Sequence, residues 1–592
     1  MRRPRRRLAL FALLPMLLFA SLAQAGVQLV VRGVDEPLQQ AVAASVGLSQ
    51  YAHREVSEAQ VRRLYAQAPA QAKAALEPYG YYDADVAAQL QAVGKDWKVT
   101  LDVRPGEPVK VTAVDVQLDA AALALPSIRR ARSAIERMRG KRLDDASYDA
   151  ARDALSATLT ANGFLDAKLV THRVEVNTAQ RSAAIKLAWQ AGRRYRYGTV
   201  HFEGSQFSEG FLDRYLPFKS GDYFDQDQLL QLQQALNGAD YFAVVNVLPQ
   251  VDEKADGKVD IKVELAPAKQ TIYTGGPFIG TDTGFGVRGG VERRWVNRRG
   301  HKWKNELVLA QRLKTLSTLY SVPMPGDNQR SFNYGANFRD ADTSTSQSRT
   351  LELVANETRL WHDWTRTVGL HALSGTFTVG KRGDEPDSTP GIEHGSSTLV
   401  FAEASLSRKQ ADNFDFVHNG WSLNFAARST AGGLLSSASF SQLTADAKWI
   451  HAFGAKQRNR LILRGSAGHT WTDDFAALPP QLRFFAGGDQ SVRGYGYQSI
   501  GPENSYGRVL GGTSLLVASA EVEHYFTRNW GIATFLDAGN AFDGTDYRPK
   551  LGTGIGVRWR SPVGMIRVDL GTPIHDSQRH GVVLHLVIGP DL

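Results

Sequence analysis

Two short segments near the C-terminus combine residue types that could form a specific charged contact. One is Val492-Arg493-Gly494-Tyr495 in a Gly- and Tyr-rich stretch, and the other is Phe535-Leu536-Asp537-Ala538-Gly539 in an alternating stretch. The planar guanidinium of Arg493 matches a carboxylate such as that of Asp537 through two parallel hydrogen bonds. Such a pair would pin a loop to the inner face of a strand wall. Either motif alone leaves open the alternative of a solvent-exposed arginine and a strand-end aspartate.

Other stretches that resemble chemistry-bearing motifs lack the surroundings that the chemistry needs. Residues 284–289 fit the dinucleotide pattern G-x-G-x-x-G, but no helix pattern follows them. Residues 375–381 fit most of a phosphate-binding loop, yet Arg382 stands where Ser or Thr must meet the metal. The sequence has no Cys, no H-E-x-x-H and no G-x-S-x-G. We therefore predict no catalytic residue, no metal site and no cofactor, and the chain is not expected to be an enzyme.

The N-terminus has the pattern of an export signal. Five arginines in residues 2–7 precede an apolar run from Leu8 to Leu22, and Ala23-Gln24-Ala25 fits a cleavage site. Without those arginines the net charge falls from +9 to +4, with 64 Lys and Arg against 60 Asp and Glu. So balanced a chain does not indicate nucleic-acid binding. No later apolar run reaches the roughly 18 residues of a membrane helix, so a membrane span would require a closed barrel.

Residues 26–267 mix strand and helix patterns in a repeat of roughly 80 residues. The turn at residues 79–84 recurs at 162–167 and, more loosely, at 239–243. Each repeat reads strand, helix, helix, strand, strand, which predicts small tandem α+β domains. We expect their bounds at 26–106, 107–194 and 195–267. Exposed edge strands in such domains suit β-augmentation, in which a partner adds a strand through main-chain hydrogen bonds.

Residues 268–592 lose the helical pattern and alternate in polarity over short segments, as in a transmembrane β-barrel. At roughly 20 residues for each strand and its connection, this length allows about sixteen antiparallel strands. Nine of the 11 Trp lie here, which favours aromatic girdles at both membrane interfaces. An exported soluble β-sandwich or propeller is the alternative, and it would not account for the Trp bias.

The two ends of this strand series have the features of weak edges. Interior glycines weaken a strand, and we expect the first barrel strand to carry Gly284, Gly286, Gly289 and Gly290. The last strand alternates, so that His585 faces the lumen while the lipid-facing stripe is Val582, Leu584, Leu586 and Ile588. Pro590 follows closely and cannot donate a ladder hydrogen bond. These features predict a seam between the first and last strands that closes incompletely.

The V-R-G-Y segment at 492–495 and the F-x-D-x-G segment at 535–539 resemble signatures of the BamA/TamA superfamily of outer-membrane assembly and secretion proteins. The repeats resemble POTRA domains, and residues 199–204 resemble the first-strand pattern of those domains. With three such units and with its C-terminal residues, the chain resembles the TamA family in particular. BamA would be expected to carry five such units, and two-partner secretion transporters two.

This resemblance implies a factor in the outer membrane of a Gram-negative bacterium, with its POTRA domains in the periplasm. It implies that the chain helps to insert a subset of outer-membrane proteins, such as autotransporters, together with a TamB-like partner anchored in the inner membrane. Unfolded clients would leave sideways through the seam into outer-membrane lipid, while Arg493 and Asp537 hold the lumen in shape. A secretion pore for one exported protein, and a lipid conduit between the membranes with TamB, are alternatives that the sequence leaves open.

Overall fold

The computed structural model describes residues 26–589 except 53, 252–255, 384, 414–415, 431–432, 434, 563 and 577–580. The predicted signal peptide, with Ala23 and Ala25, and Pro590 lie outside the described residues. The chain divides into two compact units. One comprises Met1–Val200, Phe218–Leu229 and Pro249–Ile261, and the other comprises His201–Pro217, Leu230–Leu248 and Lys262–Leu592.

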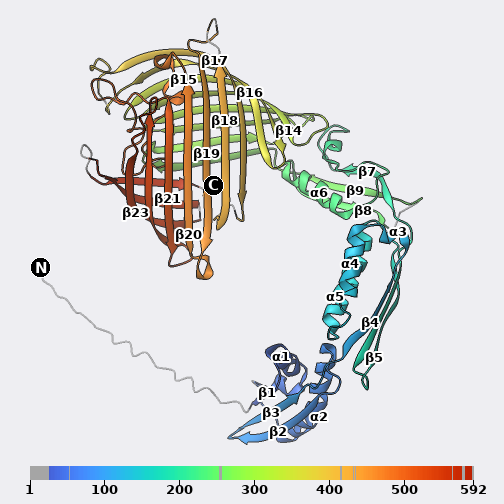
Figure 1. The fold of residues 1–592 in the computed structure, drawn as a ribbon. Coiled ribbons are helices and arrows are strands. Elements are labelled where there is room, and N and C mark those ends of the chain that lie inside the picture. Colours follow the sequence, from blue (N-terminus) through green and yellow to red (C-terminus); the bar gives the residue numbers. More distant parts are fainter. Residues whose placement is uncertain are drawn as a thin grey trace, which may run out of the picture. The chain divides into compact units, whose positions relative to one another are not determined.

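The first α+β domain packs two helices against a three-stranded sheet (Figure 1). Its elements are β1 (Val27–Arg32), α1 (Glu36–Ser45), η1 (Gly47–Tyr51), α2 (Glu58–Leu76), η2 (Glu77–Tyr79), β2 (Asp85–Val93) and β3 (Asp96–Arg104). The sheet order is β1-β3-β2, with β1 parallel and β2 antiparallel to β3. Asp35 and Ser57 cap α1 and α2 by accepting hydrogen bonds from backbone N–H groups of the first turn.

The second domain repeats this plan. Its elements are β4 (Lys110–Gln117), α3 (Ala120–Leu123), α4 (Pro126–Glu136), α5 (Asp145–Ala161), β5 (Lys168–Asn177) and β6 (Ser182–Gln190). The sheet order is β4-β6-β5. Ile128 and Ile135, seven residues apart on α4, are fully buried against the core with Leu155 of α5. No helix among the described residues is long and apolar enough to cross a membrane.

The repeated glycine turn joins one domain to the next. Gly80 and Gly163 both have positive φ, +82° and +92°, which a glycine adopts at little cost. The carbonyl of Gly80 accepts a hydrogen bond from Val109 N–H at 2.8 Å, and the carbonyl of Gly163 accepts one from Tyr195 N–H at 2.8 Å. A Cβ at Gly80 would lie 2.5 Å from the carbonyl oxygen of Leu143. The motif that revealed the repeat therefore also forms the junction between repeats.

The third domain departs slightly from the predicted plan. It consists of β7 (Arg196–Glu203), η3 (Leu212–Tyr215), α6 (Gln226–Gly238), β8 (Phe242–Pro249) and β9 (Lys258–Pro267), with sheet order β7-β9-β8. A single 3-10 turn stands where the other two domains have their first α-helices. Tyr241 of this domain donates a 2.5 Å hydrogen bond from Oη to the carbonyl of Gly300, in the turn after the second barrel strand.

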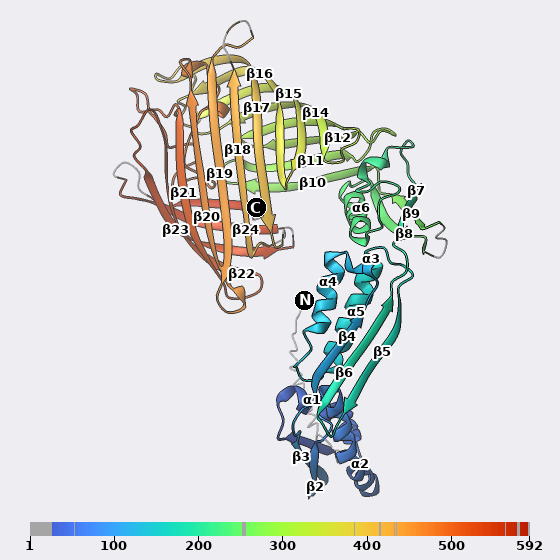
Figure 2. The ribbon, with the colours of Figure 1, turned by 45° about the vertical axis from the view of Figure 1, so that its right-hand side comes forward.

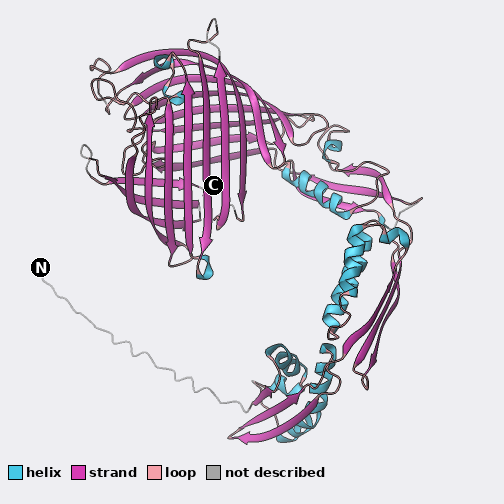
Figure 3. Ribbon diagram, viewed as in Figure 1, coloured by secondary structure: helices cyan, strands magenta, loops and turns pink. Residues whose placement is uncertain are grey.

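The rest of the described chain forms an antiparallel sheet of sixteen strands that curls into a nearly closed barrel (Figure 3). Each strand pairs with its sequence neighbours, as Figure 2 shows around the wall. The strands are β10 (Thr271–Gly280), β11 (Gly284–Arg293), β12 (Lys302–Ala310), β13 (Leu313–Pro323), β14 (Arg330–Asp342), β15 (Ser346–Trp361), β16 (Trp364–Val379), β17 (Glu393–Ala411), β18 (Asn419–Thr430), β19 (Phe440–Phe453), β20 (Asn459–Trp471), β21 (Ser514–Tyr525), β22 (Trp530–Phe542), β23 (Lys550–Ser561), β24 (Gly564–Ile574) and β25 (Val583–Gly589). The predicted fold class and strand number are confirmed.

Trp is concentrated at one end of the barrel, whereas the sequence predicted aromatic girdles at both interfaces. Trp471, at the end of β20, lies at the end of the barrel that carries the long loops. The other eight lie at or near the short turns, at the end where β10 begins: Trp295, Trp303, Trp361, Trp364, Trp421, Trp449, Trp530 and Trp559. Amphipathic indole rings anchor a barrel at the headgroup level, so this end has the stronger anchor.

The prediction that the first barrel strand carries Gly284, Gly286, Gly289 and Gly290 is wrong. These glycines lie on β11, which is paired with β10 on one side and β12 on the other. The edge strand is β10, which has its own glycines and a proline in Gly275-Gly276-Pro277. That run interrupts the alternation of polarity, and this is why the sequence pattern did not reveal β10 as a strand.

Candidate functional site

The long loop between β20 and β21, residues 472–513, folds against the inner wall of the barrel and buries the V-R-G-Y segment. Val492, Arg493 and Tyr495 are at most 3% exposed. On β22, inward and outward residues alternate, which turns Phe535, Asp537 and Gly539 to the buried side. The structure thus brings the two predicted segments together in the lumen.

Arg493 binds Asp537 through three hydrogen bonds. Its backbone N–H and its Nε donate to Oδ2 at 3.0 and 2.8 Å, and its Nη2 donates to Oδ1 at 3.0 Å. Ser519 on β21 also donates to Asp537 Oδ1 at 2.6 Å. Asp537 is fully buried, so its charge depends on these donors in place of water.

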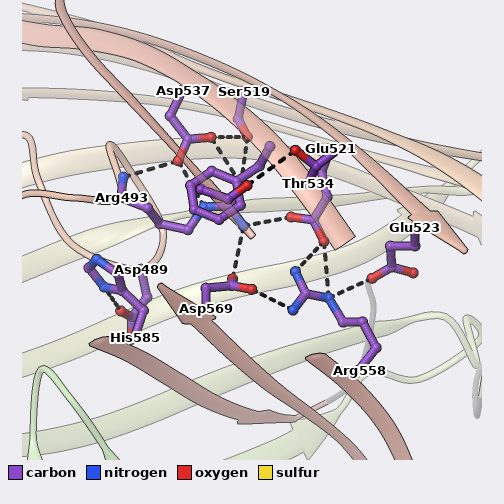
Figure 4. A network of polar contacts seen from close by, with 12 residues as sticks. Asp489, Arg493, Ser519, Glu521, Glu523, Thr534, Asp537, Arg558, Asp569 and His585 are labelled. Carbon is purple, nitrogen blue, oxygen red and sulfur yellow. Dashed lines mark hydrogen bonds and ion pairs between the residues drawn. The ribbon is translucent and has the colours of Figure 1, made fainter. Parts of the chain in front are cut away.

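The arginine is shared with two further carboxylates (Figure 4). Nη1 of Arg493 donates to Glu521 on β21 at 2.6 Å and to Asp569 on β24 at 3.0 Å. Arg558 on β23 bridges the same two groups, at 2.6 Å to Glu521 and 2.5 Å to Asp569, and also reaches Glu523 at 2.8 Å. The contact is therefore a network of alternating charges that joins one loop to four adjacent strands.

Small residues make room for this network. The guanidinium carbon of Arg493 lies 3.5 Å from the centre of the Phe535 ring, a cation–π geometry. A Cβ at Gly552 on β23 would lie 1.9 Å from the carbonyl oxygen of Arg493. Gly494 has φ +94°, and a Cβ there would lie 2.7 Å from the carbonyl carbon of Thr572 on β24. The loop backbone lies directly against the β23 and β24 backbones, and a side chain at these glycines would push it away.

Glu521, Asp569, Arg558 and Gly552 were not predicted from the sequence. The sequence does contain a pattern that could have revealed Gly552 and Arg558. Residues 552, 554, 556 and 558 on β23 are Gly, Gly, Gly and Arg, at a period of two. One face of β23 thus lacks side chains until Arg558. The acidic residues on β21 and β24 have no comparable sequence pattern, because their contact with Arg493 depends on the register of neighbouring strands.

A second polar cluster links the same loop to both ends of the strand series. Asp489 accepts hydrogen bonds from Thr281 Oγ1 at 2.9 and 3.0 Å, in the turn after β10. The same carboxylate lies 2.5 Å from Nδ1 of His585 on β25. Nε2 of His585 accepts the backbone N–H of Gly494 at 3.0 Å, which assigns the ring proton to Nδ1. His585 faces the lumen as predicted, being 2% exposed.

The outer face of the last strand matches its predicted lipid-facing stripe. Val582, just before β25, and Leu584 and Ile588 within it are exposed, and Leu586 is half-buried. Among the described residues β10 and β25 lie at the two ends of the sheet order and are not paired with each other. The side chain at Thr281 still reaches the partner strand, since its Oγ1 accepts Leu586 N–H at 3.4 Å.

One titratable group next to this cluster lies in the turn outside the strands. Burial, together with the charge of nearby Asp489, raises the pKa of the Asp282 carboxyl to about 7. Among the described residues, no group of three or more His, Cys, Asp or Glu is placed to hold a metal ion. The arrangement can hold or release a loop and a seam by exchanging hydrogen bonds.

Comparison with known proteins identifies the family. The Omp85 superfamily domain matches residues 296–590. The chain belongs to the Omp85 superfamily. Residues 28–105 match the POTRA domain described as TamA domain 1, and residues 195–267 match the POTRA repeat described as a surface antigen variable number repeat. The predicted superfamily and its location are confirmed: this Omp85 protein lies in the outer membrane with its POTRA domains in the periplasm.

Relatives of this Omp85 chain are distant in sequence. The outer membrane protein assembly factor BamA of Nitratidesulfovibrio vulgaris is 22% identical over 403 residues, covering 64% of this chain and 49% of that protein. The chain thus spans about half the length of that relative. The solved structure of Haemophilus ducreyi BamA lacking POTRA domains 1–3 has a TM-score of 0.66 at 16% identity, covering 81% of this chain and 99% of that one. The solved structure of CdiB from Acinetobacter baumannii has a TM-score of 0.46 at 15% identity, covering 81% of this chain and 89% of that one.

Proposed function

We propose that this Omp85 protein helps to assemble a subset of outer-membrane proteins, such as autotransporters, by releasing client strands through its lateral seam. The observation that carries this proposal is that β10 and β25, the two ends of the sheet, are not paired among the described residues. An unpaired edge presents backbone N–H and C=O groups that another strand can bind. Such pairing is largely independent of sequence, which suits a factor with several clients.

The length of the strands supports release at this position. β25 has 7 residues and β10 has 10, whereas β17, far from the seam along the strand order, has 19. A shorter apolar wall meets the bilayer with a mismatch, which lipid accommodates by thinning. A client strand leaving at the seam would therefore cross a thinner hydrocarbon layer than elsewhere around the barrel.

The loop is the element that would control the seam. Asp489 contacts the turn after β10 and the last strand at once, and four residues later Arg493 anchors the loop to β21, β22 and β24, on the wall next to the last strand. Opening the seam would break the contact of Asp489 with Thr281 or with His585. The Arg493 network would meanwhile keep the loop in place, so that the seam can close again.

The partner is inferred from the first POTRA domain. Its match to the TamA type supports a TamB-like partner anchored in the inner membrane. The exposed residues of β2 at the sheet edge offer a position for an added strand. The same pairing chemistry would serve two separate sites, one for a partner at the first POTRA domain and one for a client at the barrel.

The experiment that tests this function is a depletion strain analysed for both protein and lipid. We expect particular outer-membrane proteins to decline while the phospholipid and lipopolysaccharide composition stays unchanged. A changed lipid composition with these proteins intact would favour the lipid conduit. Loss of one exported protein from the medium, with the membrane proteins intact, would favour a secretion pore.

A further inference from the structure

Positive charge is concentrated on α4 and the turn that follows it in the second POTRA domain. Residues 129–142 contain seven Lys and Arg and one Glu, a net charge of +6 in 14 residues. The chain without its signal peptide has a net charge of +4. Outside residues 129–142 it therefore has a net charge of −2. We name as the basic patch the seven residues Arg129, Arg130, Arg132, Arg137, Arg139, Lys141 and Arg142.

The local fold exposes this charge. Ile128 and Ile135 anchor one face of α4 in the core of the domain. Arg130 and Arg137, also seven residues apart, share another face of the helix, and both are exposed. Lys141, in the turn after the helix, is exposed as well. All three side chains can therefore reach a ligand without any change of the domain.

Most of the charge is not neutralised within the protein. Arg132 pairs with Glu136 at 3.0 Å, and Arg142 lies 3.8 Å from Asp144. Arg129 and Arg139 donate to backbone carbonyls, which are neutral. Within the described part of the chain, Arg130, Arg137 and Lys141 make no ion pair. A charged face that serves only solubility mixes both signs evenly, whereas this one carries seven cations and one acid.

We propose that the basic patch binds the surface of an anionic phospholipid bilayer. Six of its seven cations are arginines, whose planar forks match phosphate oxygens bidentately. The cations are spread over an exposed helix and turn, and a bilayer offers phosphates spread over a comparable area. Polybasic surfaces gain affinity from each cation near such a membrane and lose it as salt screens the charge. The proposal concerns the second POTRA domain and is independent of the seam.

Vesicle binding by the full-length protein tests this proposal. The protein is held in phosphatidylcholine nanodiscs and mixed with vesicles of phosphatidylcholine, with or without phosphatidylglycerol, and binding is measured by co-flotation. The test variant combines Arg130→Gln, Arg137→Gln and Lys141→Gln. The control variant combines Arg63→Gln, Lys73→Gln and Lys95→Gln, which removes three exposed charges from the first POTRA domain. Circular dichroism and the heat-modifiable mobility of the barrel verify that each variant is folded.

The wild type and the control should bind the phosphatidylglycerol vesicles at low ionic strength, and binding should weaken with salt. The test variant should bind about 100-fold more weakly, since each cation near an anionic surface contributes roughly a factor of five. Equal losses in both variants would overturn the proposal, because they would reflect net charge alone. So would wild-type binding to polyglutamate without binding to vesicles, which would indicate an acidic protein partner.

Discussion

Arg493 and Asp537 should behave as a coupled pair, with unequal single effects. Arg493→Ala leaves the fully buried Asp537 with the Ser519 hydroxyl at 2.6 Å, the backbone N–H of residue 493 at 3.0 Å and the more distant Arg464 at 3.9 Å. Breaking a buried charge pair in this way costs about 3–5 kcal/mol. Asp537→Ala leaves Arg493 bound to Glu521 and Asp569, so we expect the smaller cost of about 1.5–3 kcal/mol for a lost charged hydrogen bond.

The double variant should cost less than the sum of the single changes by about 2 kcal/mol, because the Asp537 carboxylate is no longer present to be left without its cation. Urea unfolding of the detergent-solubilised protein, followed by the heat-modifiable gel shift, measures each value. Limited proteolysis of residues 472–513 reports whether the loop has left the wall. Arg528→Ala, at an exposed turn position, is the control and should change neither readout. Additive single effects would refute the energetic coupling of Arg493 and Asp537.

Three further outcomes follow from the site and the domain arrangement. Gly552→Ala should expose the loop to protease, because its Cβ would lie 1.9 Å from the Arg493 carbonyl oxygen. Gly465→Ala is the control and should not do so, because its Cβ would lie 3.9 Å from the nearest neighbouring atom. Equal protease sensitivity of the two variants would contradict direct contact between the loop backbone and β23. The pKa of Asp282 is raised to about 7, so the folded state binds the extra proton and stability should fall as pH rises from about 4 to 7. Asp282→Asn should remove that part of the pH dependence in a thermal melt, and an unchanged profile would assign it to another group. Deleting residues 27–103 should leave a heat-modifiable barrel that no longer co-purifies a TamB-like partner, and retained co-purification would move that contact to another domain.

Periodicity in the sequence predicted those parts of the site that a single strand determines. Phe535, Asp537 and Gly539 share one face because side chains alternate along a strand, and His585 faces the lumen for the same reason. The sixteen strands followed from the same alternation and from the available length. The first strand was missed because Gly275-Gly276-Pro277 carries no alternating pattern.

The contacts between elements were beyond a single sequence. Glu521 and Asp569 meet Arg493 because the register of β21 to β24 aligns them, and that register follows from the pairing of whole strands. The contact between Asp489 and His585 joins residues 96 positions apart through the path of a long loop. Short motifs predict which residue types can pair, but the course of the loop determines which of them do.

The most direct test of the central claim is to lock the seam with a disulfide. The chain has no native Cys, so cysteines can be placed pairwise along residues 278–281 and 584–588. The first pair to test is Gly280→Cys with Leu586→Cys, because a Cβ at residue 280 would lie 4.0 Å from the Leu586 carbonyl oxygen. Leu463→Cys with Ala520→Cys, across the paired strands β20 and β21, is the matched control. We expect oxidation of the seam pair to stop client insertion, reduction to restore it, and the control pair to have no effect. Full insertion activity with the seam quantitatively crosslinked would contradict lateral release.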